Sequence, residues 1–251
     1  MTEMRIVSNR KVADHTYEMI LAGDTTSLKT PGQFIAIKVP DYYLRRPMSV
    51  SDWDETSLRI FYKTVGHGTT AMTKIQDGAL DVLLGRGNGF CLQDAGNRTP
   101  MLIGGGVGVP PLFALAKAFV KEGKRPVVLL GFNTANEIFL AGEFEALGCD
   151  VRIATMDGST GTKGTVLECL QDVLAERPAK DFYIYTCGPR PMFQALYRAM
   201  EQEHMDGAFS LEERMGCAVG ICMGCTVETV DGPKRVCKEG PVFRKEALPW
   251  G

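Results

Sequence analysis

The chain has 251 residues, of which 45% are hydrophobic and 23% are charged, an ordinary composition for a globular protein. Its formal net charge of −2 gives no electrostatic reason to expect binding to nucleic acid. No apolar run reaches the roughly 20 residues of a membrane span, and the N-terminus lacks the apolar core of a signal peptide, so we expect a soluble, cytoplasmic protein without a membrane partner.

Residues 1–97 have the pattern of a small antiparallel β-barrel. Short runs, several of which alternate apolar and polar residues, are separated by turn residues such as Pro31-Gly32 and Asp77-Gly78. Strands are predicted at 5–7, 17–21, 33–39, 46–51, 58–63 and 79–84, with one short helix over 68–75. Short strands at this regular spacing favour a barrel.

Residues 98–205 change to an alternation of strands and helices. Strands are predicted at 101–103, 127–132, 151–155 and 182–186, and helices at 112–121, 135–147, 165–175 and 191–203. This alternation predicts a parallel sheet that is covered by helices on both faces. Ligands of such a sheet bind at the carboxyl ends of its strands.

Residues 206–251 are too few and too rich in loops for a third ordinary core, and we expect a metal centre to hold them together. Cys217, Cys222, Cys225 and Cys237 follow the spacing C-x4-C-x2-C-x11-C, which matches the ligand pattern of plant-type [2Fe–2S] clusters. Glycine residues between them let the backbone wrap closely and direct N–H groups at the sulfur atoms.

Two alternatives to an iron–sulfur cluster are open. A structural zinc site usually pairs two C-x2-C knuckles, and here only Cys222 and Cys225 form one. Disulfide bonds are disfavoured because the other four cysteine residues are scattered and the expected compartment is reducing.

A glycine-rich turn follows the first strand of the second region. Gly104, Gly105, Gly106 and Gly108 lie between this strand and the next helix, where backbone N–H groups form an anion site suited to a pyrophosphate. The turn departs from G-x-G-x-x-G because Val109 occupies the sixth place. The alternative is that the glycine residues serve only tight packing of the strand against the helix.

Two later strand ends carry further candidates. Gly188 would permit a ligand to approach closely, whereas Cys187 is either a buried small hydrophobic residue or part of the reaction site. Asp157 is placed to accept hydrogen bonds from a ribose and to repel a 2′-phosphate, which favours NAD over NADP. Its alternative role is an ordinary Asp-Gly turn.

The barrel region has a phosphate-binding pattern of its own. Arg46-Pro47-Met48-Ser49 places a guanidinium beside a rigid proline and a hydroxyl group, and an arginine fork suits phosphate oxygens. Gly68 and Thr69 follow at the start of the short helix, which Thr69 is expected to cap. Arg45 and His67 are expected to be solvated.

Together these motifs resemble the ferredoxin–NADP reductase superfamily, in which the barrel binds FAD and the sheet binds NAD(P). The added cysteine loop is similar to the electron-transfer subunits of the heteromeric bacterial dihydroorotate dehydrogenases. The resemblance covers essentially the whole chain, and its most specific parts are Arg46–Ser49, Gly104–Pro111, Asp157–Ser159, Glu213–Cys225 and Val236–Phe243.

The resemblance assigns roles residue by residue. It implies FAD contacts from Arg46, Pro47, Met48 and Ser49, flavin or ribityl contacts from Phe61, Tyr62 and Lys63, and pyrophosphate contacts from Gly68 and Thr69. The four loop cysteine residues would ligate the cluster. No side-chain acid or base is required, although Cys187 is a candidate for positioning the nicotinamide.

The implied function is electron transfer in pyrimidine biosynthesis. A partner subunit that contains FMN would oxidise dihydroorotate, and electrons would pass through the [2Fe–2S] cluster and FAD to NAD+. The complex is expected to be a heterotetramer of two plus two subunits, with the cysteine loop and Met215, Ile221 or Met223 at the interface. The alternatives are a related subunit that serves ferredoxin, a hydrogenase or a sulfite reductase, and a non-catalytic redox sensor.

Overall fold

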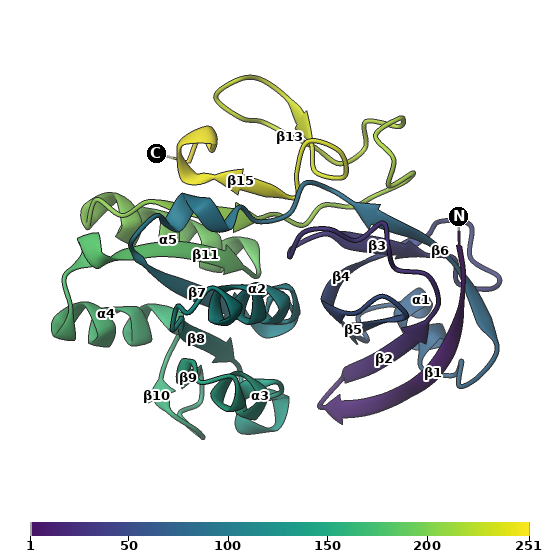
Figure 1. Cartoon of the computed structure of the whole chain (residues 1–251), viewed down its shortest axis with the longest axis horizontal. Coiled ribbons are helices and arrows are strands. Elements are labelled where there is room, and N and C mark those ends of the chain that lie inside the picture. The colour runs from purple at the N-terminus through teal and green to yellow at the C-terminus, as the bar shows by residue number, and fades with distance from the viewer. Residues whose placement is uncertain (1, 251) are drawn as a thin grey trace.

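A closed barrel forms the N-terminal part of the computed structural model, which describes residues 2–250 (Figure 1). Its antiparallel strands follow the order β1-β2-β5-β4-β3-β6. The strands are β1 (Thr2–Ala13), β2 (Thr16–Ala22), β3 (Phe34–Ile37), β4 (Arg46–Trp53), β5 (Ser57–Lys63) and β6 (Ala79–Arg86). Helix α1 (His67–Met72) packs at one end, and the interior is filled by apolar side chains such as Met19, Ile37 and Ile60. The predicted barrel is therefore confirmed.

The second part is a seven-stranded sheet in the order β10-β9-β8-β7-β11-β12-β15. All neighbouring strands are parallel except β12 and β15. The strands are β7 (Thr99–Gly105), β8 (Val127–Phe132), β9 (Asp150–Thr155), β10 (Thr162–Lys163), β11 (Phe182–Cys187), β12 (Gly207–Ser210) and β15 (Val242–Arg244). The predicted parallel sheet is confirmed.

Helices cover both faces of this sheet because its strands are apolar on both sides. Helices α4 (Val166–Glu176) and α5 (Arg190–Gln202) pack on one face, and α2 (Pro110–Lys121) and α3 (Ala141–Ala146) pack on the other. Short 3-10 turns are η1 (Leu92–Ala95), η2 (Gly106–Gly108), η3 (Ala135–Glu137), η4 (Ala179–Asp181) and η5 (Lys245–Ala247).

The prediction of one continuous helix over 135–147 was wrong. The segment forms η3, then an extended Ile138, and α3 begins only after Leu140, whose φ of 64° is left-handed. The interruption lets Phe139 pack against Phe61 of the barrel, with ring centroids 5.2 Å apart. A tertiary contact has therefore overridden a local helical pattern.

The C-terminal segment lies beside both of the other parts (Figure 1). Strands β12 and β15 form one edge of the seven-stranded sheet, and a small hairpin of β13 (Thr226–Val227) and β14 (Lys234–Arg235) projects beyond it. Asn88, in the loop after β6, donates through its side chain to the carbonyl oxygens of Glu239 and Val242 at 3.1 and 2.8 Å. The barrel and the cysteine-rich segment are thereby joined directly.

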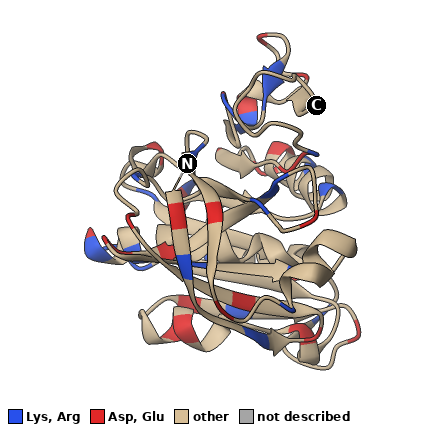
Figure 2. Ribbon diagram, turned by 90° about the vertical axis from the view of Figure 1, so that its right-hand side faces the viewer, with Lys and Arg blue, Asp and Glu red and all other residues tan. Residues whose placement is uncertain are grey.

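Charged residues of both signs are interspersed over the ribbon, in keeping with the small net charge (Figure 2). Across residues 2–250, none of the helices combines the length and the apolar character that crossing a membrane requires.

Candidate electron-transfer site

The centre of the sheet is a topological switch point between β7 and β11. The chain continues from β7 to β8 on one side and later returns as β11 on the other side, with Cys187 opposite Gly104. Crevices at such points bind ligands in open α/β sheets. The turn comes so close to β11 that a β-carbon on Gly108 would lie 2.2 Å from the carbonyl oxygen of Cys187. Position 108 therefore requires glycine, because a side chain there would collide with the backbone of Cys187.

A cavity of about 330 Å3, here called the sheet cavity, opens at this point. Its wall includes Gly105, Gly106, Gly108 and Gly188 of the predicted set, together with Asn133, Met156 and Thr165 at neighbouring strand ends. Gly106 has a φ of 53°, and a β-carbon there would meet open space. The turn therefore presents backbone to an open cavity, which is what a pyrophosphate requires.

Three other predicted residues lie outside the wall of the sheet cavity. A β-carbon on Gly104 would come within 2.9 Å of Val109, which is the packing role that the sequence left open. Asp157 follows β9 and accepts hydrogen bonds from the amide and hydroxyl groups of Ser159 at 3.0 and 2.6 Å. Cys187 is fully buried, and its burial raises the pKa of the thiol. Its positioning role stays a prediction.

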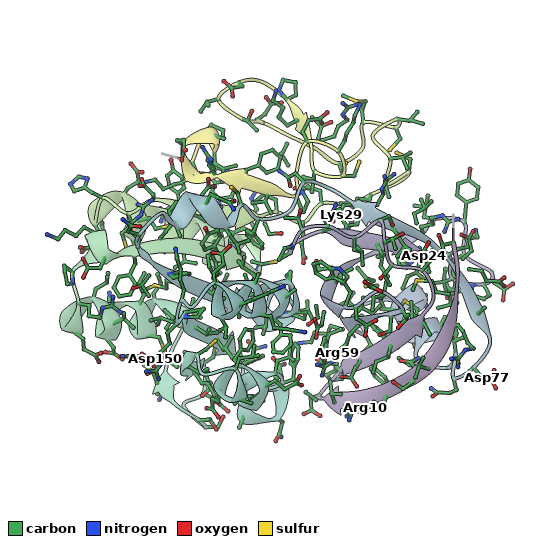
Figure 3. All side chains as sticks on the ribbon, in the orientation of Figure 1. Arg10, Asp24, Lys29, Arg59, Asp77 and Asp150 are labelled. Carbon is green, nitrogen blue, oxygen red and sulfur yellow. The ribbon has the colours of Figure 1, made fainter. Side chains whose placement is uncertain are left out.

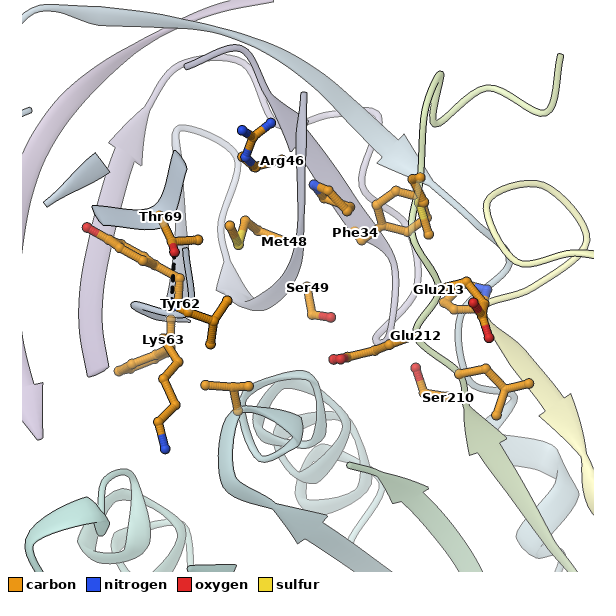
Figure 4. A pocket seen from close by; sticks show the side chains of 17 residues that line it. Phe34, Arg46, Met48, Ser49, Tyr62, Lys63, Thr69, Ser210, Glu212 and Glu213 are labelled. Carbon is orange, nitrogen blue, oxygen red and sulfur yellow. Dashed lines mark hydrogen bonds between the residues drawn. The ribbon is translucent and has the colours of Figure 1, made fainter. Parts of the chain in front are cut away.

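A second cavity of about 340 Å3, here called the barrel cavity, lies between the barrel and the C-terminal segment (Figure 4). The predicted residues that line it are Arg46, Pro47, Met48, Ser49, Phe61, Tyr62, Lys63 and Thr69. They come from β4, β5 and α1, which are separated in the sequence and joined by the barrel closure. Nearly all of the predicted flavin residues therefore share one cavity.

Gly68 belongs to the same site, although it lies behind the wall. A β-carbon on Gly68 would lie 2.2 Å from Nε of Arg46, so the guanidinium rests against the helix backbone. Thr69 is the third residue of α1 and not its N-cap. Its hydroxyl oxygen accepts from the amides of Val65 and Gly66 at 3.0 and 3.2 Å. Thr69 therefore caps the helix as expected, but from its third position and not as the N-cap residue, because the helix begins earlier, at His67.

Alternate residues of β5 point in opposite directions. Tyr62 points into the barrel, where its hydroxyl group donates to Oδ1 of Asn9 at 2.7 Å and burial raises its pKa to about 12. Lys63 points out of the barrel toward the sheet (Figure 4) and pairs with Glu137 at 3.1 Å. Its side chain borders both cavities.

Glu212 is a site residue that the sequence reasoning missed. It follows β12 and borders both the barrel cavity and the sheet cavity, as well as a third cavity of about 540 Å3. Figure 4 shows its side chain pointing into the same space as that of Ser49. Solvent reaches the carboxylate through these cavities, but protein atoms surround it on most sides, and this desolvation raises its pKa. The sequence signal was its position directly after an apolar strand that was not predicted.

The cysteine loop directs backbone amides at sulfur. Sγ of Cys217 accepts from the N–H groups of Val219, Ile221 and Cys222 at 3.3–3.4 Å. Burial raises the pKa of this thiol, but hydrogen bonds from Cys222, Val219 and Ile221 together outweigh burial and lower the pKa to about 6. Amides placed in this way stabilise a thiolate, which is the form that binds metal.

The thiols of Cys217 and Cys222 interact, and Cys225 pairs with Cys237, whose backbone amide donates to Sγ of Cys225 at 3.4 Å. Burial and the neighbouring Cys225 raise the pKa of Cys237 to about 12. All eight cysteine residues are free thiols, and residues 2–250 contain no group of three or more ligands gathered for a single metal ion. A zinc site needs four ligands around one ion, whereas each iron of a [2Fe–2S] cluster takes two thiolates, so the paired arrangement fits the cluster better.

Comparison with known proteins places this geometry in a family. Residues 212–248 match the iron–sulfur cluster binding domain of dihydroorotate dehydrogenase B, and residues 102–198 match the oxidoreductase NAD-binding domain. The dihydroorotate dehydrogenase B (NAD(+)) electron transfer subunit of Fusobacterium nucleatum is 40% identical over 95% of this chain and 94% of that protein. The chain belongs to the family of dihydroorotate dehydrogenase B electron transfer subunits. This confirms the resemblance that its motifs predict.

Other members of the family match equally broadly. The electron transfer subunit of Bacillus caldolyticus is 41% identical over 96% of this chain and 95% of that protein, and the subunit of Listeria monocytogenes serotype 4a is 38% identical over 98% of both.

Solved structures agree with the fold. The NADH-dependent reduced ferredoxin-NADP oxidoreductase, described in work on flavin-based electron bifurcation, aligns with a TM-score of 0.87 and 27% identity. That alignment covers 98% of this chain and 90% of the other. A ferredoxin NADP+ reductase from Neisseria gonorrhoeae shares the fold alone, with a TM-score of 0.69 and 15% identity over 80% of this chain and 90% of the other.

Proposed function

We propose that this chain is the electron-transfer subunit of an NAD-dependent dihydroorotate dehydrogenase in pyrimidine biosynthesis. Its FAD and [2Fe–2S] cluster carry electrons between a catalytic partner subunit and NAD+. The observation that carries the proposal is the shared wall of the barrel and sheet cavities, to which Lys63, Val107 and Glu212 contribute. Two cavities that share a wall let a flavin and a nicotinamide come into contact, which hydride transfer requires.

We assign FAD to the barrel cavity. Met48 and Phe61 offer an apolar surface for the flat flavin rings, and the guanidinium of Arg46 lies beside Gly68 where a pyrophosphate would be neutralised. Arg46 is held there by a stacking contact with Tyr42, whose ring centroid is 5.0 Å away. The donor set fits FAD, which supplies the exchange between single electrons and electron pairs.

We assign NAD to the sheet cavity. The Gly105–Gly108 turn would hold the pyrophosphate, and Asp157 at the end of β9 would select against a 2′-phosphate. The backbone of Cys187 lies against the same turn at Gly108, and we propose that Cys187 helps to position the nicotinamide. Replacement by serine tests that role, because an unchanged rate of hydride transfer in Cys187→Ser would remove it.

We propose that electrons from the partner enter this chain at the cysteine loop. Met215 lines the barrel cavity only two residues before Cys217, so a cluster in this loop lies close to the flavin. On the outer side, the side chains of Ile221 and Met223 are 82% and 52% exposed. Exposed apolar side chains beside a redox centre favour contact with another protein. We place the partner there.

The proposed partner is a cytoplasmic catalytic subunit with bound FMN, in a complex of two plus two subunits. Co-expression with a dihydroorotate-oxidising subunit, followed by affinity capture of this chain, tests the partner directly. We expect a complex that reduces NAD+ with dihydroorotate, and we expect neither subunit alone to do so. Purified subunits that form no complex would contradict the proposal.

A second candidate function is supported by the likeness to the NADH-dependent reduced ferredoxin-NADP oxidoreductase. In that case the partner would deliver electrons from ferredoxin. The same captured complex separates the two possibilities, because ferredoxin would replace dihydroorotate as the electron donor.

A further inference from the structure

Side chains on one face of β5 contact the segment after β8 that contains η3 and α3. Arg59 contacts Glu143, Phe61 packs on Phe139, and Lys63 pairs with Glu137. The three β5 residues alternate along the strand, so they share one face, while Leu58, Ile60 and Tyr62 point into the barrel core. We call this set of three contacts the seam. Figure 3 shows Arg59 at the junction of the barrel and the sheet.

The seam is polar at both ends and aromatic in the middle. Nη2 of Arg59 donates to Oε1 of Glu143 at 2.7 Å, and the guanidinium lies over the Phe61 ring at 4.7 Å from its centroid. Glu18, only 1% exposed, also pairs with Arg59 and fixes it from the barrel side. Phe139 in turn packs edge-to-face against Phe132, with ring centroids 5.7 Å apart. These contacts hold the barrel and the sheet in one orientation.

The Lys63–Glu137 pair is the only one of the three seam contacts whose two residues both line a cavity. Lys63 borders both the barrel cavity and the sheet cavity, and Glu137 borders the sheet cavity. Glu137 is itself fixed by Asn133, whose side-chain amide donates to Oε2 at 2.9 Å. Both charged side chains are largely shielded from solvent, at 28% and 17% exposure. Shielding of this kind strengthens an ion pair and reduces its screening by salt.

We propose that the Lys63–Glu137 pair sets the position of the barrel cavity against the sheet cavity for hydride transfer, with Glu137 as a positioning residue that acts through Lys63. The inference rests on the proposed function. In the assayed direction, which is the reverse of the flow to NAD+, the step moves a hydride from NADH to the flavin, so that NADH is oxidised to NAD+ and the flavin is reduced, and solvent supplies the one proton that completes the reduced flavin. Rates of such steps fall steeply when the reacting groups are misplaced by about 1 Å.

Charge-reversal variants distinguish two roles for Lys63, as a member of the ion pair or as a ligand of the cofactor. In the FAD-loaded protein, Lys63→Glu and Glu137→Lys should each slow flavin reduction by NADH by about tenfold or more, measured by anaerobic stopped flow. The double variant restores the pair with its charges exchanged and should return the rate to within about threefold of wild type. A double variant as slow as Lys63→Glu would show that Lys63 acts as a cofactor ligand instead and would overturn the proposal.

A matched control uses another ion pair between the same two parts. Lys117 of α2 pairs with Asp52 of β4 at 2.7 Å, and neither residue lines the barrel cavity or the sheet cavity. Asp52→Lys reverses an acidic residue in the same way as Glu137→Lys but should leave the rate within about twofold of wild type. An equal loss in Asp52→Lys would show that any contact between the two parts has this effect.

Hydrogen exchange gives a readout that is independent of activity. Amides of residues 137–143 should exchange faster in both single reversals and return to the wild-type rate in the double variant. Unchanged exchange in the single variants would overturn the proposal. Wild-type protein whose flavin NADH does not reduce would contradict the proposed function, and the exchange measurement would then still decide whether the pair holds the seam.

Discussion

The guanidinium of Arg46 lies against the backbone of Gly68, so closely that a β-carbon at position 68 would come within 2.2 Å of Nε. In Gly68→Ala the flexible end of Arg46 must move, while the helix itself has room to form. We expect folded protein whose affinity for FAD falls about tenfold, because a charge-assisted contact with the pyrophosphate is misplaced. Titration of the apoprotein with FAD measures this.

Gly66→Ala is the matched control for that variant. Gly66 lies two residues earlier in extended backbone, and a β-carbon there would meet nothing within 4 Å. We expect FAD affinity close to that of wild type. Equal losses in the two variants would contradict the contact between Gly68 and Arg46 as the cause.

Cys225→Ser should remove the cluster. Cys225 is 2% exposed and forms one of the two thiol pairs with Cys237, and a serine oxygen is a poor ligand for iron in place of a thiolate. We expect loss of the brown colour, together with iron and acid-labile sulfide. Cys91→Ser changes an exposed thiol that is not part of the loop and should leave both intact. Zinc without iron or sulfide in anaerobically purified wild type would contradict the cluster.

Asp157→Asn should relax the preference for NAD. The side chain accepts from Ser159 in an exposed turn, these hydrogen bonds lower its pKa, and it is therefore ionised at neutral pH. Asparagine keeps the turn and removes the charge that repels a 2′-phosphate. We expect kcat/KM for NADPH to rise about tenfold relative to NADH, because the charge that opposes a 2′-phosphate is gone. Asp150→Asn, at the opposite end of β9, should change neither value.

Glu212→Gln should stabilise the apoprotein at neutral pH. Desolvation by the protein atoms around it raises the pKa of Glu212 above its value in the unfolded chain, so the folded state binds more protons between the two values. The free energy of unfolding therefore falls as pH rises through that interval, and the ionised carboxylate costs stability above it. Because solvent reaches the group, we expect Tm at pH 7 to rise by only about 1–3 °C.

The stabilisation by Glu212→Gln should disappear at pH values below the ordinary pKa of a glutamate, where both forms are neutral. Thermal melts of the two proteins across pH measure the difference. Glu55→Gln, on the exposed turn between β4 and β5, should show no such trend. A stabilisation that persists unchanged at low pH would contradict desolvation of the charge as its origin.

Local patterns predicted most of the elements correctly because they depend on short-range chemistry. The alternation in β5, the Arg46–Ser49 run and the glycine turn after β7 are visible within a few residues, and so is the spacing of the cysteine residues. The same locality explains the errors. The helix predicted over 135–147 was interrupted by packing of Phe139 on a barrel residue 78 positions earlier, Phe61.

The sequence by itself determined which chemistry the chain carries: thiols for a cluster, an arginine for a pyrophosphate, and glycine residues for a close approach. Only the tertiary structure decided how these groups are combined. Strand β12, which the sequence did not reveal, places Glu212 between the two cavities, and β5 joins them through Lys63. The reason is physical. Ligand type and backbone freedom are properties of single residues, whereas a shared wall between cavities depends on strands that pair across the whole chain.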